Sequence, residues 1–261
     1  MKIDWRTFKQ KWSRPEPNQF PTGSRVYKGY QGSGKTLSMV KYAQDMLKKF
    51  PDCALFSNIK LYGFEQLDYT QKYDKDSDIY YYKRNFGNYQ FIHDDTILRH
   101  ALAFRNGTSG VLVLLDEAHL YFNKKTGISL DVLTAISQQR KDRKRLVFSS
   151  QIWEELDISL RKQVKEIVSC RCVASCIQIN TVYDGETLRF QYNQDGSSGY
   201  NAKKIYTEIF KHSDLLYNSY NTYQKIMTNE TYSRTPTADS HIIFNGNTNT
   251  KKSLFKSISK R

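Results

Sequence analysis

The chain has 261 residues, and its 40 Lys and Arg outnumber its 26 Asp and Glu to give a formal net charge of +14. This length excludes two helicase-type cores in tandem, and no run approaches the roughly 18 apolar residues that a membrane-spanning helix requires. With 39% hydrophobic residues the chain has enough apolar side chains for a packed core, and the surplus of positive charge predicts an anionic partner.

The two ends of the chain differ in composition from the middle. Residues 1–20 mix aromatic and basic side chains and end near a Pro-Glu-Pro sequence, which predicts an N-terminal arm. Residues 229–261 are poor in apolar side chains, and the last eleven carry five positive charges and no negative one, which predicts a flexible basic tail. The first residues lack a secretory signal, so the expected location is the cytoplasm.

Residues 21–228 are predicted to form the main domain, in which strands and helices alternate. Apolar spacings of three and four predict helices over 37–50, 96–104, 129–144 and 158–164. Apolar runs predict strands over 53–59, 111–115, 146–150 and 167–179, and a polar, tyrosine-rich stretch at 66–90 is predicted to be an insertion. Such alternation predicts an α/β fold with a doubly wound, mostly parallel sheet.

Residues 29–36 read Gly-Tyr-Gln-Gly-Ser-Gly-Lys-Thr and fit the Walker A pattern G-x-x-x-x-G-K-[ST] at every fixed position. Backbone N–H groups of a glycine-rich turn can surround phosphate oxygens, because no Cβ blocks their approach. The predicted nucleotide-binding residues are Gly29, Gly32, Ser33, Gly34, Lys35 and Thr36. We expect Lys35 to reach the β- and γ-phosphates of ATP, and Thr36 to bind Mg²⁺.

The strand expected before this loop, residues 25–28, is short and polar. We therefore expect it to lie partly exposed or at a ligand-facing edge of the sheet.

Two carboxylates follow the apolar run at 111–115 and form a Walker B motif. The carboxyl ends of parallel strands are the edge at which open α/β sheets bind ligands. We expect Asp116 to hold Mg²⁺ and Glu117 to polarise the water that attacks the γ-phosphate. Gln151 follows the next predicted strand and is expected to sense the γ-phosphate or to orient that water. The motifs together predict ATP hydrolysis.

A basic run at residues 138–145 carries five positive charges among eight residues. Three interpretations remain open: a solvated helix face, contacts with DNA phosphates, or an arginine presented to the nucleotide of a neighbouring subunit. For the last of these, the candidates are Arg140 and Arg143 on the predicted helix and Arg161 on the helix after Gln151. All three are expected near the active edge of the sheet.

These motifs together resemble the zonular occludens toxin-like (Zot-like) branch of the FtsK/HerA superfamily of P-loop ATPases. The resemblance spans residues 24–228 and is carried by residues 26–36, 54–59, 114–119, the basic run, 148–151 and 215–224. The branch is similar to genome-packaging ATPases of membrane-containing viruses and to assembly ATPases of filamentous phages. The resemblance implies a homo-hexamer or other ring that moves DNA with ATP hydrolysis, and a docking partner on a capsid or membrane.

Two functions remain open from the sequence. The first is an ATP-driven translocase of double-stranded DNA, as in a viral or plasmid genome-packaging motor, placed in the host cytoplasm or associated with virions. The net charge favours it, and so does the lack of the membrane span that filamentous-phage assembly proteins carry after the ATPase domain. The second is a virion assembly or extrusion ATPase that acts on protein partners.

Overall fold

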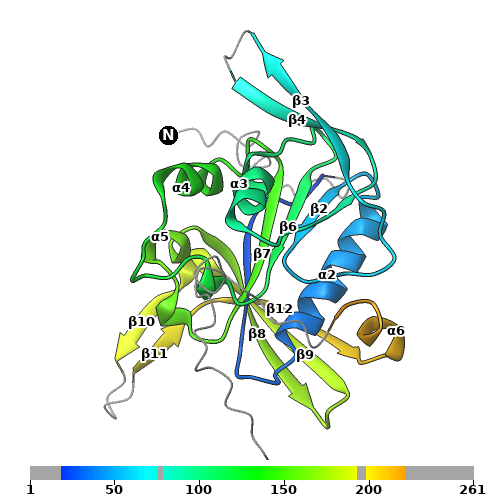
Figure 1. The fold of residues 1–261 in the computed structure, drawn as a ribbon. Coiled ribbons are helices and arrows are strands. Elements are labelled where there is room, and N and C mark those ends of the chain that lie inside the picture. Colours follow the sequence, from blue (N-terminus) through cyan, green and yellow to red (C-terminus); the bar gives the residue numbers. More distant parts are fainter. Residues whose placement is uncertain (1–18, 76–78, 193–197, 222–261) are drawn as a thin grey trace, which may run out of the picture. The chain divides into compact units, whose positions relative to one another are not determined.

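A single eight-stranded sheet organises the fold (Figure 1). The computed structural model describes residues 19–75, 79–192 and 198–221. The strand order is β12-β9-β8-β1-β7-β6-β2-β5, and all neighbours from β8 to β5 pair in parallel. These parallel strands are β1 (Gly23–Lys28), β2 (Ala54–Ser57), β5 (Tyr89–Phe91), β6 (Val111–Leu115), β7 (Lys144–Ser150) and β8 (Val164–Val173). The mostly parallel α/β sheet predicted from the sequence is therefore confirmed.

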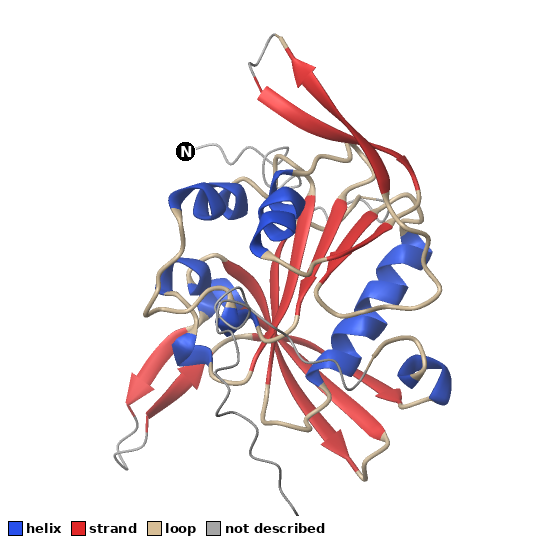
Figure 2. Cartoon of the chain, viewed as in Figure 1, coloured by secondary structure: helices blue, strands red, loops and turns tan. Residues whose placement is uncertain are grey.

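Helices cover both faces of the sheet (Figure 2). One face packs against α2 (Lys35–Lys49) and α6 (Asp214–Tyr217), and the other against α3 (Asp95–Ala103), α4 (Leu130–Ser137) and α5 (Ile158–Arg161). In β6, Val111 and Val113 belong to the second core, whereas Leu112 and Leu114 belong to the first. A strand buried on both faces needs an uninterrupted apolar sequence, which explains the run at 111–115.

Helix α2 holds the phosphate-binding loop at its N-terminus. Its buried residues include Leu37, Val40, Ala43 and Leu47, whose spacing places them on one face against the sheet. Lys48 and Lys49 occupy the last turn, where positive charge complements the helix dipole. The helix predicted over 37–50 is thus confirmed within two residues at each end.

Beyond β8 the sheet continues in two antiparallel strands, β9 (Ile177–Asp184) and β12 (Lys204–Lys211). The prediction of one strand over 167–179 is wrong, because β8 and β9 are separate strands of a hairpin. In the turn between them, Ala174 and Ser175 have φ of 50° and 54°. Serine is common in turns, but here it lies within an otherwise mostly apolar stretch, which hid the break.

Two smaller hairpins complete the described structure. The first, β3 (Asp68–Asp74) with β4 (Ile79–Phe86), lies within the predicted insertion at 66–90. Its Tyr69 and Tyr82 rings pack edge-on against His100 of α3. The second pairs β10 (Arg189–Tyr192) with β11 (Ser198–Asn201). Short 3-10 helices occur at Ala118–Leu120, Trp153–Glu155 and Gly185–Thr187.

Several predictions on the chain ends lie outside the described residues. These are the arm at 1–20, apart from its last two residues, and the basic tail at 229–261. Among the described helices, none is both long and apolar enough to cross a membrane.

The basic run does not lie on a helix, which corrects the prediction of a helix over 129–144. Helix α4 ends at Ser137, residues 138–143 form a turn, and Lys144 and Arg145 begin β7. Both of these side chains are buried, with 1% and 2% of their surface exposed. Lys144 donates to the Leu102 carbonyl and lies 3.3 Å from Asp142, so its charge is compensated inside the fold.

Strand β1 is central in the sheet rather than exposed or at an edge, which corrects the expectation drawn from its polar sequence. Arg25 is buried, with 1% of its surface exposed. Its guanidinium lies 2.8 Å from Glu166 of β8 and 3.1 Å from Glu208 of β12. Arg145 lies 2.6 Å from the same Glu166, so one carboxylate compensates two buried arginines. Burial raises the pKa of Glu166, but Arg145 and Arg25 outweigh it and hold that pKa below its ordinary value.

We predict that Glu166→Ala lowers the free energy of unfolding by about 3 kcal/mol, because it leaves two buried guanidinium groups without their shared partner. Asp45→Ala is the control, since it breaks an exposed pair with Lys41 on α2 and is expected to cost less than about 0.5 kcal/mol. Urea denaturation at neutral pH measures both losses. Equal small losses would show that the buried ion cluster does not stabilise the sheet.

Candidate nucleotide-binding site

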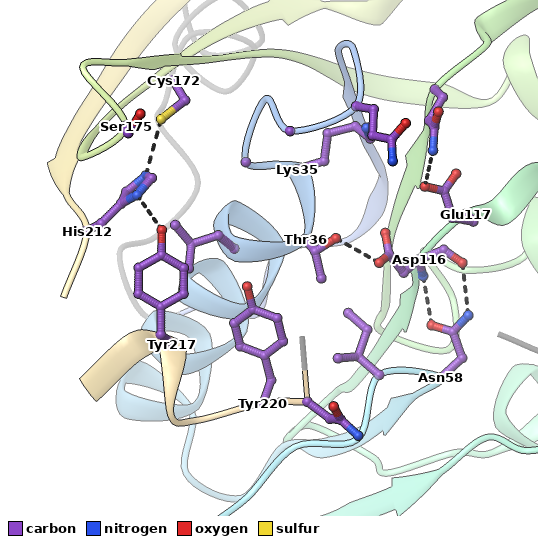
Figure 3. Close-up of a pocket in the computed structure, with 17 residues that line it drawn as sticks. Lys35, Thr36, Asn58, Asp116, Glu117, Cys172, Ser175, His212, Tyr217 and Tyr220 are labelled. Atoms are coloured by element: carbon purple, nitrogen blue, oxygen red, sulfur yellow. Dashed lines mark hydrogen bonds between the residues drawn. The ribbon is translucent and has the colours of Figure 1, made fainter. Parts of the chain in front are cut away.

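A pocket of about 660 Å³ lies at the carboxyl ends of the parallel strands (Figure 3). This is the edge at which open α/β sheets bind ligands, and the volume is in the range of small-molecule sites. The pocket brings the loop before α2 together with the ends of β2, β6 and β7 and with elements near the C-terminal end of the described chain. Its lining residues include Gln31, Gly32, Gly34, Lys35, Thr36, Asn58, Asp116, Glu117, Gln151, Cys172, Ser175, His212, Tyr217 and Tyr220.

The phosphate-binding loop is closed tightly against the sheet. Gly34 has a left-handed φ of 81°, and a Cβ at this position would lie 2.1 Å from Oε1 of Gln178 on β9. Only glycine fits there, for both reasons. Lys35 Nζ donates to the carbonyl oxygens of Gly29 and Tyr30, at 3.1 Å each.

One polar atom of the loop is left over in this arrangement. Ser33 Oγ is buried and has no hydrogen-bond partner among the described residues. A buried hydroxyl without a partner costs free energy, and a phosphate oxygen at this loop would satisfy it.

Asp116 forms the other side of the site, at the end of β6. Its side chain accepts a hydrogen bond from Thr36 Oγ1 at 2.7 Å and a second from the Ser149 hydroxyl. Burial raises the pKa of Asp116, and these two hydrogen bonds oppose the increase. Hydroxyl and carboxylate oxygens are the ligands that Mg²⁺ prefers, so Thr36 and Asp116, which the structure places in direct contact, fit a magnesium site.

Two residues that hold Asp116 were not assigned a role from the sequence. Asn58, which follows β2, accepts from the Asp116 N–H at 2.7 Å and donates to its carbonyl at 2.9 Å. Ser149, in β7, donates to the Asp116 carboxylate and accepts from the Glu117 N–H at 2.9 Å. Both are polar residues at the carboxyl ends of buried strands that flank β6, a signal that could have identified them.

Glu117 and Gln151 come together as the sequence predicted. Gln151 Nε2 donates to Glu117 Oε1 at 2.8 Å, and the second carboxylate oxygen of Glu117 lies 3.4 Å from His119 Nδ1. Glu117 has a φ of 51°, a left-handed conformation that is uncommon for this residue type. The conformation is held by the hydrogen bond from its own N–H to Ser149. Gln151 therefore orients the carboxylate, and Ser149 fixes the backbone that carries it.

The three candidate arginines do not lie at this edge of the sheet, which corrects the prediction. Arg140 and Arg143 are in the turn just before β7, and because β7 runs parallel to β6, that turn is at the opposite edge from Asp116. Arg161 ends α5 shortly before β8 and lines a separate hollow with Trp153. Their action on the nucleotide of a neighbouring subunit stays a prediction. It no longer has the support of a helix that would place them near the active edge of the sheet.

The chain has the fold of a P-loop NTPase, in which the glycine-rich loop before α2 faces the Asp116 carboxylate at the end of β6, a buried strand of the same sheet. A family model described as zonular occludens toxin (Zot) matches residues 25–224. This covers more than half of the chain, which therefore belongs to the Zot family.

Solved structures of other proteins resemble the chain at low sequence identity. The N-terminal domain of zonular occludens toxin from Neisseria meningitidis has a TM-score of 0.48 and 15% identity, covering 77% of this chain and 99% of that one. The genome packaging NTPase B204 from Sulfolobus turreted icosahedral virus 2, in complex with ATP-gammaS, has a TM-score of 0.43 and 14% identity, with coverages of 73% and 100%. The flagellar accessory protein FlaH from Methanocaldococcus jannaschii has a TM-score of 0.39 and 9% identity, covering 77% of this chain and 97% of that one. No curated protein is significantly similar in sequence.

We predict that Asn58→Ala lowers the free energy of unfolding by about 2 kcal/mol, because it leaves the backbone N–H and C=O of Asp116 without partners in a buried site. Asn85→Ala is the matched control: that amide donates to Asp68 at 3.0 Å but is exposed, so a loss below about 0.5 kcal/mol is expected. Urea denaturation compares the two. If Asn58→Ala costs no more than the control, Asn58 does not hold the Walker B strand end.

Proposed function

We propose that the chain hydrolyses ATP and uses the energy to translocate double-stranded DNA, as a genome-packaging motor of a virus or plasmid. The observation that carries the hydrolytic part is the position of Glu117. Its carboxylate projects into the phosphate end of the pocket, fixed by Gln151, next to the residue pair that fits magnesium. A P-loop enzyme that transfers phosphate to water needs a residue that activates or positions that water, whereas one that only binds nucleotide does not.

The chain's own residues divide the work of hydrolysis. The loop N–H groups and Lys35 bind the phosphates, for which the Lys35 ammonium exchanges its carbonyl partners for phosphate oxygens. Thr36 and Asp116 would hold Mg²⁺, which when bound neutralises charge on the phosphate oxygens. Glu117 accepts a proton from the attacking water as the water oxygen bonds to the γ-phosphorus, and the bond from that phosphorus to the bridging oxygen breaks to release ADP. Gln151 keeps Glu117 oriented and lies where it can detect the γ-phosphate.

The net charge of +14 supports DNA as the substrate that is moved, because each phosphate that a protein neutralises releases counterions and strengthens binding. In the basic run, Arg140 and Lys141 remain exposed, although Lys144 and Arg145 are buried. A homo-hexamer or other ring, and a docking partner on a capsid or membrane, belong to the same proposal.

One observation favours the second function, an assembly or extrusion ATPase that acts on protein. Strand β12 is at the edge of the sheet, and its Ile205 and Ile209 are 53% and 66% exposed. Exposed apolar residues on an edge strand are suited to a protein contact rather than to DNA.

The hydrolytic mechanism predicts different defects in two variants. Lys35→Ala is expected to lose ATP binding, because the ammonium contacts phosphate in the ground state, whereas Glu117→Gln is expected to bind ATP and lose at least about 100-fold in kcat. Lys48→Ala, at an exposed position in the last turn of α2, is the control and should match the unmodified chain. Calorimetry with a non-hydrolysable ATP analogue and phosphate release measure the two steps. Normal turnover in Glu117→Gln would remove Glu117 from the mechanism.

Duplex DNA separates the two functions. For a translocase we expect DNA to stimulate ATP hydrolysis, and the apparent DNA affinity to fall linearly on a log–log plot against salt concentration. Hydrolysis is measured with and without duplex DNA over a series of salt concentrations, with single-stranded DNA and a neutral polymer as controls. Hydrolysis that no DNA stimulates, by a chain that binds no DNA at low salt, would contradict translocation and favour the protein-directed function.

A further inference from the structure

The end of the pocket away from Glu117 is built by residues that hydrolysis does not use. Cys172 of β8, Ser175 of the β8–β9 turn, His212 just after β12, and Tyr217 of α6 line it. In Figure 3 these side chains lie on one side of the phosphate-binding loop, and Glu117 lies on the other. The end of β8, the antiparallel strands that follow it and α6 place them there.

The direction of a bound nucleotide follows from this arrangement. The γ-phosphate belongs next to Glu117 and Gln151, and the loop and Lys35 take the phosphates next to it. The ribose and base must then extend away from Glu117, and the remaining space of the pocket leads toward His212 and Tyr217. The volume of about 660 Å³ is in the range that holds a whole ligand of this size.

A chain of hydrogen bonds fixes the side chains at this end relative to the loop. Gln178 is fully buried, and its amide nitrogen donates to the Ser33 carbonyl at 2.9 Å and to Asn180 Oδ1 at 3.0 Å. Its amide oxygen is therefore an acceptor and must receive the N–H of His212 Nε2, 3.3 Å away. His212 Nδ1 is then left as an acceptor for the Tyr217 hydroxyl, at 2.7 Å.

These hydrogen bonds determine which part of Tyr217 is available to a ligand. Its hydroxyl is used by His212, so the ring is the part that can meet a ligand, and the side chain is 39% exposed. The two rings are edge to face, with centroids 5.6 Å apart, and the partial exposure of Tyr217 leaves part of its ring accessible. An aromatic face next to a phosphate site is suited to a flat heteroaromatic base.

We propose that Tyr217 and His212 form the nucleoside subsite of this pocket, in which the Tyr217 ring stacks on a purine base. The inference rests on the proposed binding of ATP and extends it to the part of the ligand that is not phosphate. The hydrogen-bond chain through Gln178 joins the subsite to the phosphate loop at Ser33, so the two halves of the nucleotide are held by one connected structure.

The test compares two ligands that share the phosphates and differ in the nucleoside. Binding of a non-hydrolysable ATP analogue and of inorganic tripolyphosphate, each with Mg²⁺, is measured by calorimetry on the full chain. The variants are Tyr217→Ala, which removes the ring, and Tyr217→Phe, which keeps it. Leu215→Ala is the matched control, because Leu215 is on the same helix, 83% exposed, and is not among the residues lining the pocket.

We expect Tyr217→Ala to weaken binding of the analogue about tenfold or more, equivalent to about 1.4 kcal/mol. Tripolyphosphate should bind this variant as it binds the unmodified chain, which also shows that the variant is folded. Tyr217→Phe should stay within about threefold of the unmodified chain for the analogue, and Leu215→Ala should change neither ligand.

Three results would overturn the subsite. An unchanged affinity of Tyr217→Ala for the analogue would place the base elsewhere, and an equal loss for both ligands would make the tyrosine a support for the loop only. An unmodified chain that binds tripolyphosphate as tightly as the analogue also contradicts the subsite, but leaves the phosphate site intact. An unmodified chain that binds neither ligand contradicts the proposed function itself.

Discussion

The candidate site depends on the buried carboxylate of Asp116 and on the groups that donate to it. Thr36 from α2 and Ser149 from β7 bind its oxygens, and Asn58 after β2 binds its backbone on both sides. A buried carboxylate without such partners would be costly, so these contacts are also a condition for the fold. They fix the phosphate-binding helix relative to three adjacent strands, and the position of Glu117 follows because it is the next residue.

At the amino ends of the central strands, the fold must compensate buried positive charges. Arg25 and Arg145 share Glu166, and Lys144 pairs with Asp142, so a chain with a large positive surplus can place basic residues inside its central strands. The number of basic residues in the chain is therefore larger than the number that an anionic partner can meet at its surface. The basic run illustrates this, since part of it is directed into the fold and part into solvent.

The antiparallel strands β9 and β12 extend the sheet on the side of the phosphate loop. Gln178 on β9 donates a hydrogen bond to the loop at Ser33, and it fits there because Gly34 has no side chain. Because β12 leads directly into His212 and then α6, the same strands bring the last described residues of the chain to the pocket. The glycine-rich loop and the C-terminal elements of the described chain are thus joined through one buried amide.

The sequence by itself determined the elements whose signals are local. The apolar run predicted β6 with its observed bounds, the three-and-four spacing predicted α2, and the Walker A pattern located the loop, because these signals depend only on neighbouring residues. Tertiary structure alone decided that Gln178 and His212 lie at the same site, and that Arg140 and Arg143 lie away from it. These placements depend on strand order and register between segments far apart in the chain, and spacing along the sequence carries no information about either.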